Sequence, residues 1–389
     1  MFTIKVLNKI SSKGLDLLPR EDYEIASEIQ NPDAILVRSF NMLDMELPSK
    51  LKAIARAGAG VNNIPIEKCT EKGIVVFNTP GANANAVKEL TIASLLLSSR
   101  KIHKGIEWAQ SLKGKGDEVS SLVEKGKSQF EGPEIFGKRL GVIGLGAIGV
   151  MVANDALALG MEVIGYDPFI SINAAWELSS HVIRAANIEH LLATSDYITI
   201  HVPYNDKTKG MLNKEKFSIM KKGTRILNFA RGGLVVNSDL LEAMDNDTVA
   251  CYVTDFPCDD LLGNDKVITI PHLGASTPES EENCAVMAAS ELKEFLSKGH
   301  IKNSVNFPDC ELSRSGETRI IAAHDNVPNM FGQITTTLAQ NKINIGDMLS
   351  RHKDKIGYTI LDIEGSVPDS VIDSIKAIQG VRMIRVLHR

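Results

Sequence analysis

One segment of the sequence, residues 138–167, limits most strongly what this chain can fold into. Leu140-Gly141-Val142-Ile143 has the composition of a buried strand and runs directly into Gly144-Leu145-Gly146-Ala147-Ile148-Gly149, after which helix-compatible residues continue to Leu159. In a strand-turn-helix unit the first glycine makes the tight turn, the second lets the backbone approach a pyrophosphate, and the third lets the helix pack on the strand. The segment therefore predicts an α/β fold that binds a dinucleotide at the amino end of this helix.

The residue at the end of the next strand distinguishes between the two nicotinamide dinucleotides. Residues 162–166 read as that strand, and Asp167 follows it, 18 residues after Gly149. A carboxylate there accepts hydrogen bonds from the adenosine ribose hydroxyls and would repel a 2′-phosphate. The following Pro168-Phe169-Ile170 offers no arginine to receive such a phosphate. The sequence thus favours NAD over NADP, and it favours both over a glycine-rich turn that binds no ligand.

The remaining apolar patterning predicts three domains. Short apolar runs alternate with helix-length stretches from Phe2 to Asn78, again from 138 to 272, and in a shorter series from 318 to 389, which is typical of α/β structure. A helix expected after Ser276, with Pro278 in its first turn, would carry the chain back to the first domain. We therefore expect a discontinuous α/β domain at 1–98 and 288–308, a Rossmann-type domain at 99–287, and a third, smaller α/β domain at 317–389.

Charge and cysteine usage narrow the choice of partners. Forty-three basic residues against 48 acidic ones give a formal net charge of −5, which offers no bulk attraction to nucleic acid or anionic lipid. No apolar run reaches the ~20 residues that span a bilayer, and the first residues lack the apolar core of a secretory signal. The five scattered cysteines have no pair at the two-residue gap typical of metal sites. We expect a cytoplasmic homodimer or homotetramer with free thiols, a small-molecule substrate, and no metal, nucleic-acid or membrane partner.

Three polar segments each follow a predicted strand of the second domain, on the side of an open α/β sheet where ligands bind. They are residues 228–233, 253–257 and 270–274, and they contain Arg231, Asp255 and His272. Oxidation of a 2-hydroxy acid needs a base, a cation for the carboxylate, and an acid that holds the base. Histidine fits the first role through its ordinary pKa of about 6.5, and arginine fits the second through its planar fork. Taken singly, each residue also fits an ordinary packed or surface role.

With these motifs in this order, the sequence resembles the D-2-hydroxyacid dehydrogenase family over nearly the whole chain. The motifs are the glycine segment, Asp167-Pro168, His201-Val202-Pro203, residues 228–233 and Pro271-His272-Leu273-Gly274. The resemblance implies NAD as cofactor, Arg231 as the substrate-binding arginine, and His272 as the proton acceptor. It also implies a flavodoxin-like fold for the first domain and a position of Asp255 near the nicotinamide carboxamide. The other implied cofactor contacts, besides Gly144, Gly146, Ala147, Ile148, Gly149 and Asp167, are His201, Val202, Pro203, Thr208, Ala230 and Gly274.

One departure from the family concerns the acid that holds the histidine. The family places a glutamate a few residues after the aspartate that matches Asp255, whereas this chain has Asp259 and Asp260. The shorter side chain can still orient an imidazolium if the loop brings it closer. The spacing favours Asp260 over Asp259, although either acid also fits a solvated loop. The expected catalytic residues are therefore Arg231, His272 and Asp260.

The resemblance also implies a substrate site in the first domain. The family holds the substrate carboxylate with backbone amides of a glycine-rich loop, here Ala57 to Asn63, in which glycines permit close approach. Arg38-Ser39 resembles the pair that binds phosphate in members with a phosphorylated substrate, although Phe40 stands where a second basic residue often follows. Lys138 could reach in from a neighbouring subunit, or could be a solvated lysine before a strand. The expected substrate contacts are Arg38, Ser39, Ala59, Gly60, Asn83 and Lys138.

The C-terminal residues resemble an ACT domain, a βαββαβ module that binds amino acids across paired copies. Its usual turn glycine after the proline is Asn329 here, which tolerates the left-handed conformation. The resemblance implies L-serine as an effector, held by His324 and Asn326 with Asn344 of the partner copy. A purely assembling role for this module is the alternative.

Together these resemblances imply oxidation of D-3-phosphoglycerate as the activity. Two alternatives remain at this point. One is a dehydrogenase for an unphosphorylated D-2-hydroxy acid such as glycerate, lactate or 2-hydroxyglutarate. The other is a non-catalytic, NAD-sensing binding protein built on the same fold.

Overall fold

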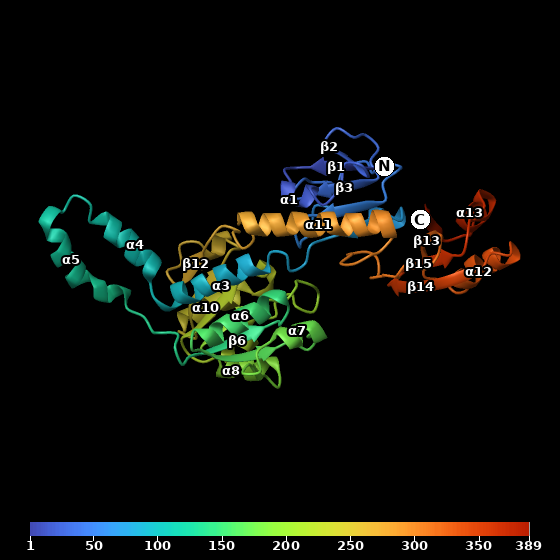
Figure 1. Cartoon of the computed structure of the whole chain (residues 1–389). Helices are drawn as coiled ribbons and strands as arrows, with labels where there is room; N and C mark the ends of the chain where they lie inside the picture. The colour runs from blue at the N-terminus through green and yellow to red at the C-terminus, as the bar shows by residue number, and fades with distance from the viewer. Residues whose placement is uncertain (389) are drawn as a thin grey trace. The chain divides into compact units, whose positions relative to one another are not determined.

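The first apolar runs of the chain form a parallel sheet in the computed structural model, which describes residues 1–388 (Figure 1). Side chains of successive strand residues point to opposite faces, so Leu36 packs in one core and its neighbours Ile35 and Val37 in another. Both faces are therefore buried, as the uninterrupted apolar runs indicate. The strand order is β2-β1-β3-β4-β5, the flavodoxin-type order that was predicted. These strands are β1 (Phe2–Leu7), β2 (Tyr23–Ala26), β3 (Ala34–Val37), β4 (Ala53–Arg56) and β5 (Val75–Phe77), accompanied by α1 (Ser12–Leu15) and α2 (Ile66–Glu71).

A long helix, α11 (Pro278–Lys298), covers one face of this sheet. Its buried positions include Ala285, Ala288 and Leu292, which recur at three- and four-residue spacing on one side of the helix. They join the core that holds Leu36 and Phe77. The helix predicted after Ser276 is thus present, and it packs on the first sheet.

The last part of the chain forms an antiparallel four-stranded sheet of order β14-β15-β13-β16. Two helices cover one face, and the other face shares a core with Phe295 of α11 and with Phe307. The predicted βαββαβ order is confirmed, and Asn329 has the predicted left-handed conformation, with φ of 62°. The elements are β13 (Thr318–Asp325), α12 (Met330–Gln340), β14 (Ile345–Lys353), β15 (Ile356–Ile363), α13 (Asp369–Lys376) and β16 (Val381–His388).

Buried polar groups fix this small sheet to the carboxyl end of α11. The last four carbonyl groups of a helix have no partner within it, and here two arginines of the sheet supply donors. Arg385 donates to the carbonyls of Phe295 (3.0 Å) and Leu296 (2.7 Å), and Arg319 donates to that of Lys298 (2.9 Å). Arg319 also pairs with Asp362 through two bonds of 2.7 and 2.8 Å, with both side chains fully buried. Positive charge at this end of α11 is further favoured by the helix dipole.

The middle of the chain forms a Rossmann-type parallel sheet of order β12-β11-β10-β9-β6-β7-β8. The order reverses between β6 and β9, which creates the crevice where such sheets bind ligands. The strands are β6 (Arg139–Ile143), β7 (Glu162–Tyr166), β8 (Ile183–Arg184), β9 (Tyr197–Ile200), β10 (Thr224–Asn228), β11 (Val249–Thr254) and β12 (Val267–Thr269). The helices are α3 (Ala84–Ser99), α4 (Ile102–Ser111), η1 (Gly116–Glu118), α5 (Val119–Gly126), η2 (Lys127–Phe130), α6 (Ala147–Ala158), α7 (Ile172–Glu177), α8 (Ile188–Thr194), α9 (Lys214–Ser218), η3 (Gly232–Leu234), α10 (Asn237–Asp245) and η4 (Asp259–Leu261).

The chain divides into two packed units, Met1–Asn83 with Pro278–Arg389, and Ala84–Thr277. Helix α3 belongs to the second unit because its Val87 and Leu95 pack in the core that contains Val150 of α6. Packed units and functional domains need not share boundaries, so the three-domain division at 1–98 with 288–308, 99–287 and 317–389 stays a prediction. None of the helices within residues 1–388 is both long and apolar enough to cross a membrane.

Candidate functional site

The glycine segment between β6 and α6 has the geometry that its sequence predicts. Gly144 has φ of 92°, and a Cβ atom there would lie 2.7 Å from the carbonyl oxygen of His201. A Cβ atom on Gly149 would overlap the carbonyl oxygen of Gly144. At Gly146, in contrast, a Cβ atom would meet no atom within 4 Å. The fold itself therefore requires the first and third glycines. The second glycine borders open space, which is expected where a pyrophosphate binds.

Asp167 lies at the end of β7 and holds this glycine segment. Its Oδ2 accepts a hydrogen bond from the amide of Leu145, and its Oδ1 accepts one from the amide of Phe169, both at 2.8 Å. Each carboxylate oxygen has a second lone pair. Asp167 can therefore fix the loop and still accept hydrogen bonds from ribose hydroxyl groups.

His201 follows β9, on the other side of the point where the strand order reverses. Its Nε2 lies 2.9 Å from the hydroxyl of Thr199, and burial lowers the pKa of His201 to about 4. The imidazole is therefore uncharged near neutral pH, which suits contact with an uncharged part of a cofactor.

Four further predicted cofactor contacts lie in the segments after β9 and β10. Thr208 donates from its hydroxyl to the carbonyl of Pro203 at 2.6 Å and accepts from the amide of Asn205 at 2.9 Å, so it closes a turn. The amide of Ala230 donates to the side chain of Asn228 at 3.2 Å. Direct cofactor contacts of Val202, Pro203, Thr208 and Ala230 stay predictions.

Arg231, Asp255 and His272 follow three adjacent parallel strands, β10, β11 and β12, so they lie at the same edge of the sheet. Asn228 holds the first of these segments, because its buried amide donates to the carbonyl of Arg231 at 2.9 Å and to the hydroxyl of Tyr252 at 3.0 Å. The Arg231 guanidinium donates to the carbonyl of Ala230 at 2.6 Å and remains exposed. The arrangement offers a cation, a carboxyl group and an imidazole side by side.

Asp255 is only 1% exposed, and neither of its carboxyl oxygens has a hydrogen-bond partner of ordinary geometry within residues 1–388. Burial raises the pKa of Asp255, against the opposing effects of the His272 charge, the amide of Gly274 and the Arg231 guanidinium. A buried carboxyl group without a partner is unfavourable unless a ligand supplies a donor. Its position between His272 and Arg231 makes Asp255 a candidate ligand contact.

The acids predicted to hold His272 do not contact it in this structure. Asp259 and Asp260 are exposed in η4, and no hydrogen bond or ion pair joins either of them to His272 within the part of the chain described. The Asp255 carboxyl group, in contrast, lies close enough to His272 for the charge of the imidazole to oppose the rise in its pKa that burial causes. From the sequence, Asp255 was assigned only to the cofactor. The chain lacks the glutamate with which the family holds the histidine, and that absence was the available signal that another acid could face His272. The role of Asp260 stays a prediction.

On the first sheet, Arg38 and Ser39 follow β3. The amides of Ser39 and Phe40 donate to the side chain of Asn8, at 3.0 and 2.6 Å, and Asn8 follows the adjacent strand β1. The carbonyl of Arg38 accepts from Nε of Arg56 at 3.0 Å. Sequence reasoning missed Arg56, which ends β4 and pairs in register with Val37; a basic residue at the end of the strand beside Arg38 was the available signal.

The remaining substrate residues lie in different surroundings. The carbonyl of Ala59 accepts from the side chain of Asn78 at 2.6 Å, and a Cβ atom on Gly58 would lie 2.5 Å from Nη1 of Arg56. Gly60 and Asn83 are half-buried, and Lys138 is exposed before β6 in the other unit. Substrate contacts of Ala59, Gly60, Asn83 and Lys138 therefore stay predictions.

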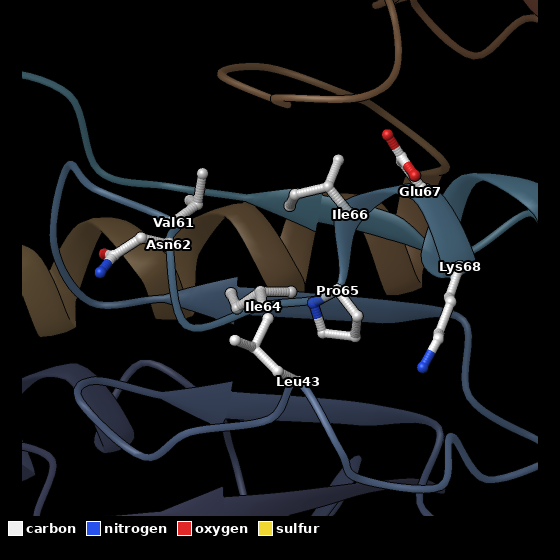
Figure 2. A pocket seen from close by; sticks show the side chains of 8 residues that line it. All are labelled: Leu43, Val61, Asn62, Ile64, Pro65, Ile66, Glu67 and Lys68. Atoms are coloured by element: carbon white, nitrogen blue, oxygen red, sulfur yellow. The ribbon is translucent and has the colours of Figure 1, made fainter. Parts of the chain in front are cut away.

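A pocket of about 680 Å³ borders the same glycine-rich loop (Figure 2). Its lining is mainly aliphatic, and Figure 2 shows the side chains of Leu43, Ile64 and Pro65 close together. Asn62, Glu67 and Lys68 contribute the polar groups. This lining suits an anionic hydroxy acid less well than the strand ends that carry Arg38 and Arg231.

The predicted effector residues lie at two ends of the small sheet. His324 is buried, with Nδ1 2.9 Å from the carbonyl of Asp325 and Nε2 2.9 Å from the hydroxyl of Thr359. Asn326 donates to the carbonyl of Asp354, beyond one end of β14, whereas Asn344 precedes the other end of that nine-residue strand. Nine residues of strand span roughly 30 Å. One copy of the chain therefore does not bring all three residues together, and their role as an effector site stays a prediction.

Within residues 1–388, no group of three or more histidine, cysteine or acidic side chains could hold a metal ion. The five cysteines all lie in the described part of the chain and are free thiols.

Comparison with protein families matches residues 92–274 to the family described as "D-isomer specific 2-hydroxyacid dehydrogenase, NAD binding domain". Curated relatives include D-3-phosphoglycerate dehydrogenase of Methanocaldococcus jannaschii, which is 35% identical over 82% of this chain and 60% of its own length. The enzyme of the same name from Bacillus subtilis is 35% identical over 79% of this chain and 59% of its own length. The chain thus spans about 60% of the length of these relatives.

Solved structures resemble this chain over most of its length. One is NAD+-bound 3-phosphoglycerate dehydrogenase of Entamoeba histolytica, with 27% identity and a TM-score of 0.61, covering 78% of this chain and 98% of that one. Another is D-lactate dehydrogenase of Aquifex aeolicus in complex with NAD and lactic acid, with 26% identity and a TM-score of 0.60, covering 79% of this chain and all of that one.

Proposed function

We propose that the chain, whose residues 92–274 match the D-isomer specific 2-hydroxyacid dehydrogenase family, oxidises D-3-phosphoglycerate to 3-phosphohydroxypyruvate with NAD, the first step of L-serine synthesis. The single observation that carries the proposal is the placement of Arg231, Asp255 and His272 at the ends of adjacent strands of the sheet that also carries the glycine segment. The relatives named D-3-phosphoglycerate dehydrogenase support the choice of substrate.

The residues of the second unit fit NAD as the cofactor. The open space at Gly146 suits the pyrophosphate, and the free lone pairs of Asp167 suit the ribose hydroxyls. The buried, unpartnered carboxyl group of Asp255 suits the amide donor of the nicotinamide carboxamide. When bound, NAD accepts a hydride from the substrate carbon that carries the hydroxyl group.

The side chains of the chain supply the acid-base and charge chemistry. His272 takes the proton of the substrate hydroxyl, for which an exposed imidazole is suited. Arg231 holds the substrate carboxylate through its guanidinium fork. Asp255, and Asp260 if its loop closes, stabilises the imidazolium that forms. Arg38 and Ser39 bind the phosphate, with Lys138 of a neighbouring subunit as a further contact.

The test is NADH formation by the purified protein with a panel of D-2-hydroxy acids: 3-phosphoglycerate, glycerate, lactate and 2-hydroxyglutarate. We expect turnover of 3-phosphoglycerate, with NAD preferred over NADP. Turnover of an unphosphorylated acid alone would show that this acid, and not 3-phosphoglycerate, is the substrate. Binding of NAD without turnover of any acid would identify a non-catalytic binding protein.

The proposal extends to the oligomeric state of the protein, its location in the cell and its regulation by an amino acid. We propose a cytoplasmic homodimer or homotetramer in which L-serine binds between paired small sheets and inhibits the enzyme. His324 and Asn326 of one copy and Asn344 of the other would hold the amino acid. The placement of Asn344 at the far end of β14 from Asn326 supports contributions from two copies.

A further inference from the structure

The cation that the proposed function assigns to the substrate phosphate is already paired in this structure. Nη2 of Arg38 lies 2.8 Å from Oε1 of Glu281, with side chains 37% and 46% exposed. Glu281 lies in the first turn of α11, 243 residues further along the chain. The phosphate would therefore meet an ion pair and not a free arginine.

The main chain around Arg38 is held in place independently of that pair. The amides of Ser39 and Phe40 donate to Asn8, which has a left-handed φ of 74°. The carbonyl of Arg38 accepts from Nε of Arg56 at 3.0 Å and from the side-chain Nδ2 of Asn63 at 3.3 Å. The fixed backbone keeps the Arg38 side chain within reach of Glu281, so an anion that binds the guanidinium must compete with that carboxylate.

The charge on Glu281 is favoured by its position. An acid in the first turn of a helix is stabilised by the helix dipole, and Glu281 is one of the acids in that turn. The next residue, Glu282, pairs with Lys13 at 2.5 Å. Two neighbouring carboxylates thus face different cations, and only Glu281 faces the arginine of the candidate substrate site.

We infer that Glu281 is a specificity-determining residue, which competes with a phosphorylated substrate for Arg38 and lowers the selectivity of the enzyme for the phosphate. The inference rests on the proposed function of the same site. A phosphate must displace the carboxylate or lie beside it, and like charges at short range repel. A neutral hydroxyl group at the same position can donate to Glu281 while Arg38 stays paired. The pair therefore admits 2-hydroxy acids that end in an uncharged hydroxyl, such as D-glycerate, beside phosphorylated ones.

The exposure of the pair makes the inference testable by substitution. Exposed ion pairs contribute little to the stability of a fold, so Glu281→Gln removes the charge while the protein stays folded. Glu282→Gln is the matched control, because it removes the same charge from the same helix turn but acts on Lys13. Arg38→Ala and the double variant Arg38→Ala/Glu281→Gln show whether an effect passes through Arg38.

The experiment measures kcat/KM for D-3-phosphoglycerate and for D-glycerate, and the inhibition constant of inorganic phosphate. In Glu281→Gln, kcat/KM for D-3-phosphoglycerate divided by kcat/KM for D-glycerate should rise by about three- to tenfold. The inhibition constant of inorganic phosphate should fall by a similar factor. In Glu282→Gln both should change by less than about twofold. In the Arg38→Ala background, Glu281→Gln should change neither value.

An unchanged or lower ratio in Glu281→Gln would overturn the inference and would make the carboxylate a support that orients Arg38. An equal rise of the ratio in Glu282→Gln would also overturn the inference, as would a rise caused by Glu281→Gln in the Arg38→Ala background. The change in net charge alone would then explain the effect. If the wild type oxidises neither acid, the proposed function fails by itself. Calorimetric titration with inorganic phosphate then decides the inference: tighter binding by Glu281→Gln than by wild type supports it, and equal or weaker binding overturns it.

Discussion

The ring of Phe256 meets the imidazole of His272 edge to face, with ring centres 5.0 Å apart and planes inclined by 74°. Phe256 directly follows Asp255, so the short segment after β11 gives the histidine both an apolar wall and a nearby carboxyl group. Aromatic pairs of this geometry contribute about 0.5–1.5 kcal/mol beyond the area they bury. The contact therefore helps to fix the orientation of the imidazole.

The first prediction concerns the two residues assigned to the reacting groups. His272→Ala and Arg231→Ala should each lower kcat by roughly 10²–10⁴-fold, because each removes a base or a charge-stabilising group. NAD affinity, measured by calorimetry, should stay near that of the wild type. As a control, Phe256→Leu should lower kcat far less, since it loosens His272 without removing it. Near-normal turnover in either alanine variant would contradict the mechanism.

The second prediction concerns the choice of dinucleotide. Asp167→Ala and Asp167→Asn should both lower the NAD to NADP ratio of kcat/KM by roughly tenfold or more, since a hydrogen bond to a charged group contributes about 1.5–3 kcal/mol. The asparagine variant can keep one of the two acceptors for the amides of Leu145 and Phe169, whereas the alanine variant loses both, so the alanine variant should additionally bind both dinucleotides more weakly. Equal use of NAD and NADP by the wild type would show that the carboxylate does not select.

The third prediction concerns the buried pair of the small sheet. Asp362→Asn leaves the charge of Arg319 without its partner and should destabilise the first unit by about 3–5 kcal/mol. Both tryptophans, Trp108 and Trp176, lie in the other unit, so hydrogen exchange of the α11 amides is the appropriate measurement. Glu282→Gln, which breaks an exposed pair, should cost less than about 1 kcal/mol. Similar exchange rates in the two variants would refute the prediction.

The fourth prediction concerns pH. Glu291 lies on the buried side of α11, where its Oε1 accepts from Asn303 at 2.8 Å and its Oε2 has no partner within residues 1–388. Burial raises the pKa of Glu291 to about 8; Asn303 and Lys302 oppose the shift, and Asp309 adds to it.

An acid whose pKa is higher in the folded than in the unfolded state binds a proton more readily when folded. Its contribution to stability is therefore complete below the unfolded pKa of about 4.5 and is lost as the pH rises through about 8. Glu291→Gln removes this dependence, so the variant should match the wild type near pH 4 and exceed it in stability near pH 8.5. Hydrogen exchange of α11 at several pH values measures this, and a stability difference that does not grow with pH would contradict the assignment.

The fifth prediction concerns the small sheet as an effector site. L-serine should bind and inhibit, with a coupling of about 1–3 kcal/mol, and Asn344→Ala should abolish both effects. Asn341→Ala is the matched control, because that side chain follows α12 and donates back to the carbonyl of Thr337 in the same helix. Calorimetry and initial rates provide the measurements. An enzyme that neither binds serine nor responds to it at millimolar concentration would leave the small sheet a structural role.

Features that depend on neighbouring residues were predictable from the sequence. The turn at Gly144, the acid at Asp167 and the left-handed Asn329 all follow from local sterics and apolar periodicity. The strand order of the first sheet was also predictable, because the family resemblance implied it.

Pairings between distant residues were not predictable. Arg38 and Glu281 meet only because α11 returns to the first sheet, and nothing local to either residue indicates the pair. The relation of Asp255 to His272 depends on how two separate loops are placed. The packing of the small sheet on α11 depends on Arg319 and Arg385, whose sequence neighbourhoods read as ordinary strands.

The packing of the small sheet has a consequence for the history of the chain. Phe295 and Phe307 are fully buried in a core that the sheet completes, and Phe307 lies edge to face with Tyr358 of that sheet. Loss of the sheet would uncover both aromatic rings and leave the carboxyl end of α11 without its arginine donors. In evolutionary terms the module is entrenched: a chain that discarded the sheet would have to rebuild the core around Phe295 and Phe307.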